Sequence, residues 1–282
     1  MNQIAILLIT TIHLPFSYSQ QLTGDSFEDA LRNKTATLTY VYNDETGCAS
    51  MNEAGEMEGI MIELMEEFQF YVQDKYDISI VSKYEKIEDR DFEKFMNAVK
   101  NSNGGVFGLS YISITASRQN NYKFSLPFMK NVLVMATNEN VQPLNSIEKI
   151  GTIFDGKTAL CVKSSTYQES LEMIRKNYFP GMEIRFVRSE LEAFDKIVED
   201  NSYFAIFDLL LYLEFYRKKY PIKRHKVEID QEDVFGIAMP LNSDWKPVLD
   251  EFFESGFLTS QRYKEIVAEN LGRSAVRLVE GL

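Results

Sequence analysis

Cysteine and histidine are scarce in this chain, which has two of each among 282 residues. The two cysteines, Cys48 and Cys161, are too few for a disulfide framework, although a single bond between them stays an alternative. Cys161 stands in the apolar run TALCV, and we interpret it as a buried core thiol. Two histidines leave little for a zinc site, and the acidic residues follow no metal-binding pattern. We therefore expect no metal and no cofactor.

Basic charge and long apolar runs are also in short supply. Lys and Arg total 30 against 42 Asp and Glu, which gives a formal net charge of -12. Nucleic-acid binding and electrostatic membrane anchoring both need clustered basic residues, so we expect neither. Beyond residue 20 no segment approaches 18 consecutive apolar residues, and we expect no membrane span there.

The first 20 residues differ from the rest. The run IAILLITTIHLPF is apolar and free of formal charge, and Ser17 and Ser19 follow with the spacing of a signal-peptidase site. We expect a cleavable signal peptide at 1–20 and a periplasmic or secreted protein. A buried N-terminal strand or helix is the alternative.

Strand-like and helix-like segments alternate along the remaining chain, which predicts an α/β fold with mainly parallel sheets. T-x-x-E at Thr166 and S-x-x-E at Ser189 predict capping boxes at two helix starts. We interpret the charged segment KYEKIEDRDFEK (83–94) as a solvated helix face. The expected strands are 36–42, 106–113, 132–137, 158–164, 183–187, 203–208 and 233–240, and the expected helices are 59–76, 91–102, 166–178, 189–200, 209–220, 243–256 and 260–272.

The alternation runs in two cycles, separated by the connector NENVQPLNSIEKI. We interpret them as two lobes around a cleft, each a sheet flanked by helices, with a hinge between them. The predicted first lobe comprises 21–136 plus 237–282, and the second comprises 137–236. The chain would then cross between the lobes twice.

Polar residues stand at the ends of three predicted strands, where open α/β sheets bind ligands. The first strand ends at Ser113 and is followed by Thr115 and Arg118, and the second is followed by Ser165 and Thr166. The third runs through FAIF and stops at Asp208. Thr115 can cap a short helix, which puts Arg118 in a first turn that the backbone already makes positive. A bound anion between the arginine and the helix start would explain this placement.

Together these residues suggest a ligand with both charges. Arg118 can hold a carboxylate with two hydrogen bonds, and Asp208, an acid within an apolar run, can accept an ammonium group. A small molecule with both groups is an α-amino acid. The alternatives are a surface position for Arg118 and simple helix capping by Asp208, Ser165 and Thr166.

These segments resemble the type II periplasmic solute-binding proteins of amino-acid transporters, which are related to the ligand core of ionotropic glutamate receptors. SITASR followed by YKFSLPF resembles the S/T-I-T-x-x-R and F-S-x-P-[YF] block of that family. The segments EAGEMEGIMIELMEEF, VKSSTYQESL, FAIFD and VFGIAMP resemble further family segments in the same order. Ser164 replaces a usual glycine, and Phe107 stands near the place of a usual aspartate. These departures leave the ligand side chain open.

The resemblance implies a role for each candidate residue. Arg118 would bind the ligand α-carboxylate, with Ser113 adding its N–H and hydroxyl, and Ser165 and Thr166 approaching from the second lobe. The Tyr111 carbonyl and Asp208 would meet the α-amino group. Tyr40 or Tyr42 would replace the usual aromatic platform, and we select Tyr42. The two lobes would close on the ligand, and the protein, expected to be a monomer, would deliver it to an ABC-type membrane permease.

Two other functions fit the same scaffold. A sensor that presents a ligand to a membrane receptor has the same sequence features as a transport protein. A dehydratase of cyclohexadienyl acids would need a general acid or base aimed at the ligand. His225, in basic IKRHK, is interpreted as a surface residue, and an ammonium group would lower the pKa of Asp208. We therefore expect a binding protein and not an enzyme.

Overall fold

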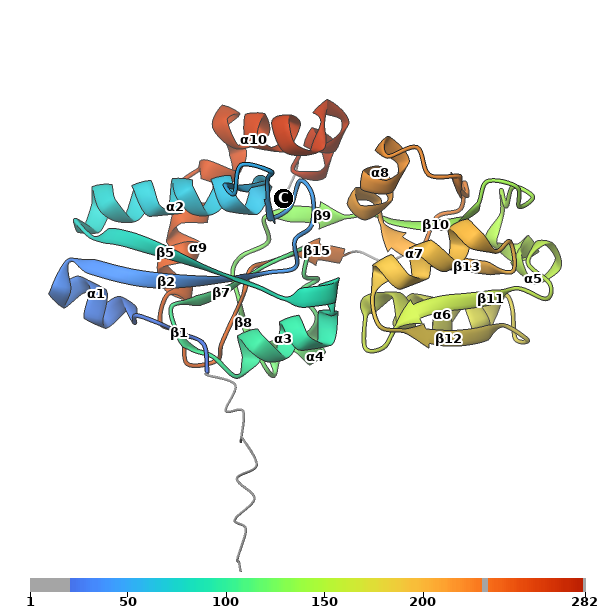
Figure 1. Cartoon of the computed structure of the whole chain (residues 1–282), viewed down its shortest axis with the longest axis horizontal. Coiled ribbons are helices and arrows are strands. Elements are labelled where there is room, and N and C mark those ends of the chain that lie inside the picture. The colour runs from blue at the N-terminus through green and yellow to red at the C-terminus, as the bar shows by residue number, and fades with distance from the viewer. Residues whose placement is uncertain (1–20, 230–232, 281–282) are drawn as a thin grey trace, which may run out of the picture.

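The computed structural model describes residues 21–229 and 233–280. The predicted signal peptide at 1–20 lies outside the described residues. The chain forms two lobes side by side, each built on a five-stranded sheet with helices packed against it (Figure 1). The predicted α/β fold with two lobes is confirmed.

The first lobe carries the sheet with strand order β5-β2-β7-β16-β8. Helix α2 lies against this sheet through its buried residues, which include Leu64, Phe68 and Val72 at helical spacing. Fully buried Trp245 packs edge-on against Phe68 in the same core. The elements are α1 (Phe27–Asn33), β2 (Thr35–Tyr42), α2 (Ile60–Tyr76), β5 (Ser79–Lys86), α3 (Phe92–Lys100), β7 (Val106–Leu109), α4 (Ala116–Gln119), β8 (Lys123–Phe124), β16 (Ala238–Met239), α9 (Lys246–Glu254) and α10 (Gln261–Leu271).

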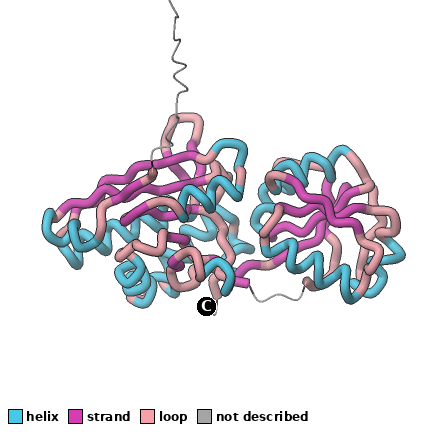
Figure 2. Tube along the Cα trace, turned by 90° about the horizontal axis from the view of Figure 1, so that it is seen from below, coloured by secondary structure: helices cyan, strands magenta, loops and turns pink. Residues whose placement is uncertain are grey.

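The second lobe carries the sheet with strand order β12-β11-β13-β10-β14, which Figure 2 shows with helices around it. A separate apolar cluster lies on each side of this sheet. The apolar strand β11 is buried along its whole length, as expected for a strand covered on both faces. The elements are β10 (Leu133–Asn138), α5 (Ile150–Ile153), β11 (Thr158–Val162), α6 (Thr166–Asn177), β12 (Glu183–Val187), α7 (Glu190–Glu199), β13 (Tyr203–Asp208), α8 (Leu209–Arg217) and β14 (Ile222–Arg224).

Two antiparallel strands, β9 (Met129–Asn131) and β15 (Asp233–Phe235), connect the lobes. Asn131 is paired with Asp233 in this ribbon. Strand β9 leads into β10 of the second sheet, and β15 leads into β16 of the first. Strand β10, which contains the predicted boundary at 136–137, pairs with β13 and β14 of the second lobe. The predicted division of the chain between the lobes stays a prediction.

Both sheets are mixed, with two parallel and two antiparallel pairings in each. The parallel pairs come from the β-α-β succession that the sequence indicates. The antiparallel pairs involve β16 and β10, the strands through which the chain enters each lobe from the other. A strand that arrives by such a crossing need not follow the direction of the β-α-β units.

The interpretation of residues 83–94 as one helix face was wrong. Lys83–Lys86 belong to β5, which pairs in parallel with β2 over eight residues. A short 3-10 turn (Glu88–Arg90) follows, and α3 begins at Phe92. The charged residues suit an edge strand, where they discourage pairing with other chains.

The capping residues show what local sequence can predict. The hydroxyl of Thr115 accepts the Arg118 N–H at 3.2 Å, and the hydroxyl of Ser189 accepts the Glu192 N–H at 3.2 Å, so both residues cap their helices as predicted. The second half of the predicted box at Ser189 differs, because the Glu192 carboxylate accepts the Arg188 N–H at 3.0 Å. The predicted box at Thr166 was wrong, because α6 begins one residue earlier than that box requires. Ser165 is its N-cap, and its hydroxyl donates to the Val162 carbonyl at 2.7 Å.

Cys48 and Cys161 are both buried and free, which confirms the core position of Cys161 and excludes a bond between them in this structure. His225 is buried at 1% exposure, so its interpretation as a surface residue was wrong. Its Nδ1 accepts the Leu144 N–H at 2.9 Å, and its Nε2 lies 2.8 Å from the Thr137 hydroxyl. Burial, with help from Lys223 and Lys157, lowers the pKa of His225 to about 4. Its role is to satisfy polar groups within the second lobe.

Candidate functional site

A cavity of about 220 Å³ lies between the lobes. This volume is somewhat below that of typical drug-sized ligand sites and suits a small metabolite. The first lobe contributes Glu45, Thr46, Gly47, Arg90, Phe92, Ser110, Tyr111, Ser113, Arg118, Asn270 and Leu271, and the second contributes Ser165, Thr166, Tyr167, Glu190, Leu191, Asp208, Leu210, Leu211, Leu213, Glu214, Arg217 and Lys218.

Six of the seven predicted site residues line this one cavity. They are Tyr111, Ser113, Arg118, Ser165, Thr166 and Asp208. Tyr42 is not among its lining residues and instead packs, 2% exposed, in the first-lobe core. The β2 strand that carries it ends at that residue, and the chain then turns so that Glu45 faces the cavity instead.

Arg118 is held in place by three contacts of different kinds. Its N–H is capped by Thr115, its guanidinium donates to the Ser113 carbonyl at 3.0 Å, and it lies 5.1 Å above the centre of the Phe92 ring. Burial lowers the pKa of this guanidinium below its usual range. Within residues 21–229 and 233–280, no carboxylate forms an ion pair with it. The cavity therefore presents a desolvated cation with hydrogen-bond donors to spare.

Asp208 is the N-cap residue of α8 by position, but its side chain makes no capping bond. Its Oδ2 accepts the Tyr167 hydroxyl at 2.7 Å, and its Oδ1 accepts an N–H of Asn131 at 2.5 Å. Burial raises the pKa of Asp208 to about 7, although these two hydrogen bonds oppose the rise. The simple capping interpretation does not describe this residue. A cationic group beside it would favour its ionised form.

A chain of hydrogen bonds runs from Asp208 to the first lobe through the connecting strands. Asn131 donates to Asp208 and also to Asp233 Oδ2 at 2.9 Å, and the Ser113 hydroxyl donates to the same oxygen at 2.6 Å. The Ser113 hydroxyl is thus already bonded to Asp233. Sequence reasoning missed Asn131, Asp233 and Tyr167, because only the pairing of β9 with β15 brings the first two together.

The remaining predicted residues have fewer polar partners. Thr166, at 5% exposure, begins α6 and lies beside Ser165 in the cavity wall. The Tyr111 ring packs 5.3 Å from that of Phe235. Its hydroxyl is buried beside the Cys48 thiol, and burial raises the pKa of Tyr111 above its usual range.

Two glutamates that sequence reasoning missed also line the cavity, Glu45 from the first lobe and Glu190 from the second. Glu45 follows the end of β2, and Glu190 follows the end of β12 as the first residue of α7. The strand-end rule that selected Asp208 would have found them had it been applied to every strand. Burial raises the pKa of both carboxyl groups, that of Glu190 to about 7.

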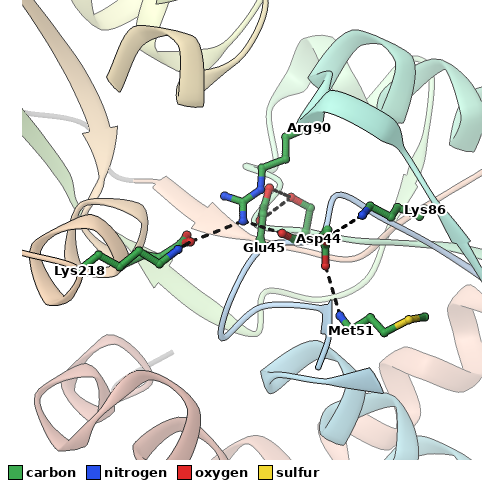
Figure 3. A network of polar contacts seen from close by, with 8 residues as sticks. Asp44, Glu45, Met51, Lys86, Arg90 and Lys218 are labelled. Carbon is green, nitrogen blue, oxygen red and sulfur yellow. Dashed lines mark hydrogen bonds and ion pairs between the residues drawn. The ribbon is translucent and has the colours of Figure 1, made fainter. Parts of the chain in front are cut away.

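Charged and apolar contacts between the lobes surround the cavity. Arg90 donates to the Asp44 carbonyl at 2.6 Å and lies 3.5 Å from Glu214 of α8, which also pairs with Lys218 at 2.7 Å (Figure 3). Arg217 of α8 donates to the carbonyl of Leu271 in α10. Leu210 of the same helix packs in the first-lobe core. Helix α8 therefore contacts the first lobe through Leu210, Glu214 and Arg217.

No group of histidine, cysteine and acidic residues in the described chain is placed to hold a metal ion. None of the helices in the described residues combines the length and apolarity needed to cross a membrane.

No family model and no curated protein matches the sequence. Solved structures do match it in fold. An ABC uptake transporter substrate-binding protein from Streptococcus pneumoniae with bound histidine is similar at a TM-score of 0.68 and 17% identity, over 89% of this chain and 98% of that one. The GluR0 ligand-binding core from Nostoc punctiforme in complex with L-glutamate is similar at a TM-score of 0.63 and 18% identity, over 83% and 99%.

These likenesses show that the chain has the two-lobed, type II periplasmic-binding-protein fold. The predicted resemblance is confirmed at the level of the fold. It goes no further, because sequence identities this low carry no information on the ligand.

Proposed function

We propose that this protein is a non-enzymatic solute-binding protein that captures an α-amino acid between its lobes. The observation that carries the proposal is that Arg118 and Asp208 line one cavity from opposite lobes, and neither forms an ion pair with another described residue. A zwitterion supplies a carboxylate for the arginine and an ammonium for the aspartate. Each charge then gains a partner that the protein alone does not provide.

The placement of the two charges on different lobes also supports a closing mechanism. A ligand held by both would link the lobes, and the strands β9 and β15 are the segments about which they would move. The Ser165 and Thr166 segment of the second lobe would approach the ligand carboxylate, as the resemblance implies. Delivery to an ABC-type permease is the proposed use of the captured ligand, with presentation to a membrane receptor as the alternative. Both uses fit a protein exported by a signal peptide.

A dehydratase-like enzyme is the second candidate, and the cavity offers one observation in its favour. Asp208 and Glu190 both have a pKa raised to about 7, near the value that suits a general acid or base at neutral pH. An ammonium beside Asp208 would return its pKa to the usual range and remove this capacity. Incubating the protein with any ligand that binds, and following that ligand by NMR, separates the candidates, because a binding protein leaves it unchanged.

The first experiment is a thermal-shift screen of the protein against the twenty amino acids and a set of small carboxylates. A true ligand at a hundredfold excess over its Kd stabilises the protein by about 2.7 kcal/mol. We expect stabilisation by at least one amino acid, and its loss in Arg118→Ala. Arg188→Ala is the control, because Arg188 is 88% exposed on the second lobe and lies outside the cavity.

The outcomes of the screen divide clearly. Silence from every amino acid would refute the proposed ligand class. Equal stabilisation by carboxylates that lack an amino group would keep the role of Arg118 and refute that of Asp208. Stabilisation that survives Arg118→Ala would place the ligand elsewhere.

A further inference from the structure

The cavity contains more carboxylates than a simple zwitterion requires. Glu45 and Glu190 face it from opposite lobes in addition to Asp208. The Ser110 hydroxyl lies 3.3 Å from both carboxylate oxygens of Glu45. In the part of the chain that the structure describes, no basic side chain forms an ion pair with either glutamate.

The basic groups near these glutamates already have other partners. Arg90 attracts Glu45 electrostatically, but its guanidinium is hydrogen-bonded to the Asp44 carbonyl and paired with Glu214 (Figure 3). Arg118 attracts Glu190 electrostatically but would hold the ligand α-carboxylate in the proposed function. Once the α-carboxylate and α-ammonium of an amino acid are placed, Glu45 and Glu190 remain without a dedicated counter-ion.

The two glutamates also repel each other across the cavity, and Glu45 adds to the raised pKa of the other cavity carboxyl groups. Glu45 raises the pKa of Glu190 and of Asp208, and Glu214 raises that of Glu45. Because Glu45 and Glu190 stand on different lobes, this repulsion opposes lobe closure whenever both are ionised. A cation between them would turn the repulsion into two attractions.

The apolar part of the cavity wall suits a ligand with a long side chain. Phe92, Leu191 and Leu211 provide apolar wall of the kind that accommodates methylene groups. Tyr111 lines the same cavity, and its buried hydroxyl interacts electrostatically with Cys48 and with Glu45.

We propose that the ligand is an α-amino acid with a cationic side chain, an ammonium or guanidinium group, held between Glu45 and Glu190. This inference rests on the proposed function, since Arg118 and Asp208 must hold the α-groups for the two glutamates to be left to the side chain. It assigns Glu190 and Glu45 as the residues that select the ligand, and it makes the side-chain cation necessary for full closure.

The test is a comparison of ligands that differ in side-chain charge and little in shape. Isothermal titration calorimetry at pH 8 would compare arginine with citrulline, and lysine with norleucine. Charge-assisted hydrogen bonds to a buried carboxylate predict that the cationic member of each pair binds roughly ten- to a hundredfold more tightly. Glu190→Gln and Glu45→Gln, which keep side-chain size, should each reduce this ratio to within roughly threefold of unity.

Matched controls separate this result from a general effect of removing charge. Glu199 lies on the same helix as Glu190 but is exposed and outside the cavity, so Glu199→Gln is the control for Glu190→Gln. Glu53 is exposed in a turn eight residues after Glu45 and also lies outside the cavity, so Glu53→Gln is the control for Glu45→Gln. Both should keep the wild-type ratio. Small-angle scattering should show a more compact protein with arginine than with citrulline.

Each outcome decides one of the two proposals. Tight binding of neutral amino acids, with cationic ones no better, would overturn the cationic side chain and leave the proposed function intact. A ratio that Glu190→Gln does not change would overturn the assignment of Glu190. Failure of every amino acid to bind wild-type protein would overturn the proposed function and this inference together.

Discussion

The buried Asp208 carboxyl should leave a measurable signature in the pH dependence of stability. Its pKa is about 7 in the folded protein, against 3.8 for a free aspartate. Between about pH 4 and 7 the folded chain therefore holds a proton that the unfolded chain has lost. Stability contributed by this group falls as pH rises through that window, and the full cost of roughly 4 kcal/mol applies only above it.

Asp208→Asn removes this titration while keeping the size of the side chain, and Asn131 can still donate to its carbonyl oxygen. Because native and unfolded wild type differ in bound protons at pH 5 but hardly at pH 8, the wild type loses stability relative to the variant over this range. We expect the free energy of unfolding of the variant, relative to that of the wild type, to increase by roughly 2–3 kcal/mol between pH 5 and pH 8. Groups that do not interact with Asp208 cancel in this difference, whereas Glu190, whose pKa Asp208 helps to raise, adds a smaller change of the same sign.

Urea unfolding of ligand-free protein, followed by circular dichroism at both pH values, measures this quantity. Asp155→Asn, an exposed substitution in the second lobe, is the control, and its difference from wild type should change by less than roughly 0.5 kcal/mol. A difference between Asp208→Asn and wild type that stays constant from pH 5 to pH 8 would refute the claim that Asp208 is buried with a raised pKa.

Three further predictions follow from other parts of the molecule. Arg90→Ala removes the pair with Glu214 between the lobes and should shift the closing equilibrium by roughly 1 kcal/mol toward open forms; unchanged small-angle scattering would contradict this. Because the pKa of His225 is lowered to about 4 in the folded protein, the wild type should lose roughly 3 kcal/mol of stability as pH falls from 7 to 4. A His225→Gln variant whose stability in urea unfolding has the same pH profile would argue against this lowered pKa. Gly59→Ala places a Cβ 2.4 Å from the Cys48 carbonyl oxygen at φ +116°, so it should lower the melting temperature far more than Gly55→Ala, where φ is +82° in open space; equal losses would count against a backbone clash.

Much of the fold could be predicted from the sequence because it depends on local pattern. Each of these signals is local: the apolar run of β11, the helical spacing of α2 and the caps at Thr115 and Ser189 each depend on residues that are close together in the sequence. Strand β5 escaped prediction because its charged residues suggest a solvated surface, whereas its pairing with β2 and the packing of Ile80 and Tyr84 against the core come from distant parts of the chain. Buried His225 escaped for a similar reason, since its basic neighbours give no sign of the Thr137 and Leu144 groups that surround it.

The sequence by itself determined the alternation of strands and helices, and with it the two lobes, and it placed Arg118 and Asp208 at strand ends where a ligand can reach them. Tertiary structure alone decided which carboxylates share the cavity with them. Glu45 and Glu190 come from different lobes, and Asn131 meets Asp208 and Asp233 only through the β9–β15 pairing. The physical reason is the distance along the chain over which each effect acts. Periodicity and capping act over one or two turns, whereas burial, pKa and the charge balance of a cavity depend on groups that only the packed lobes bring together.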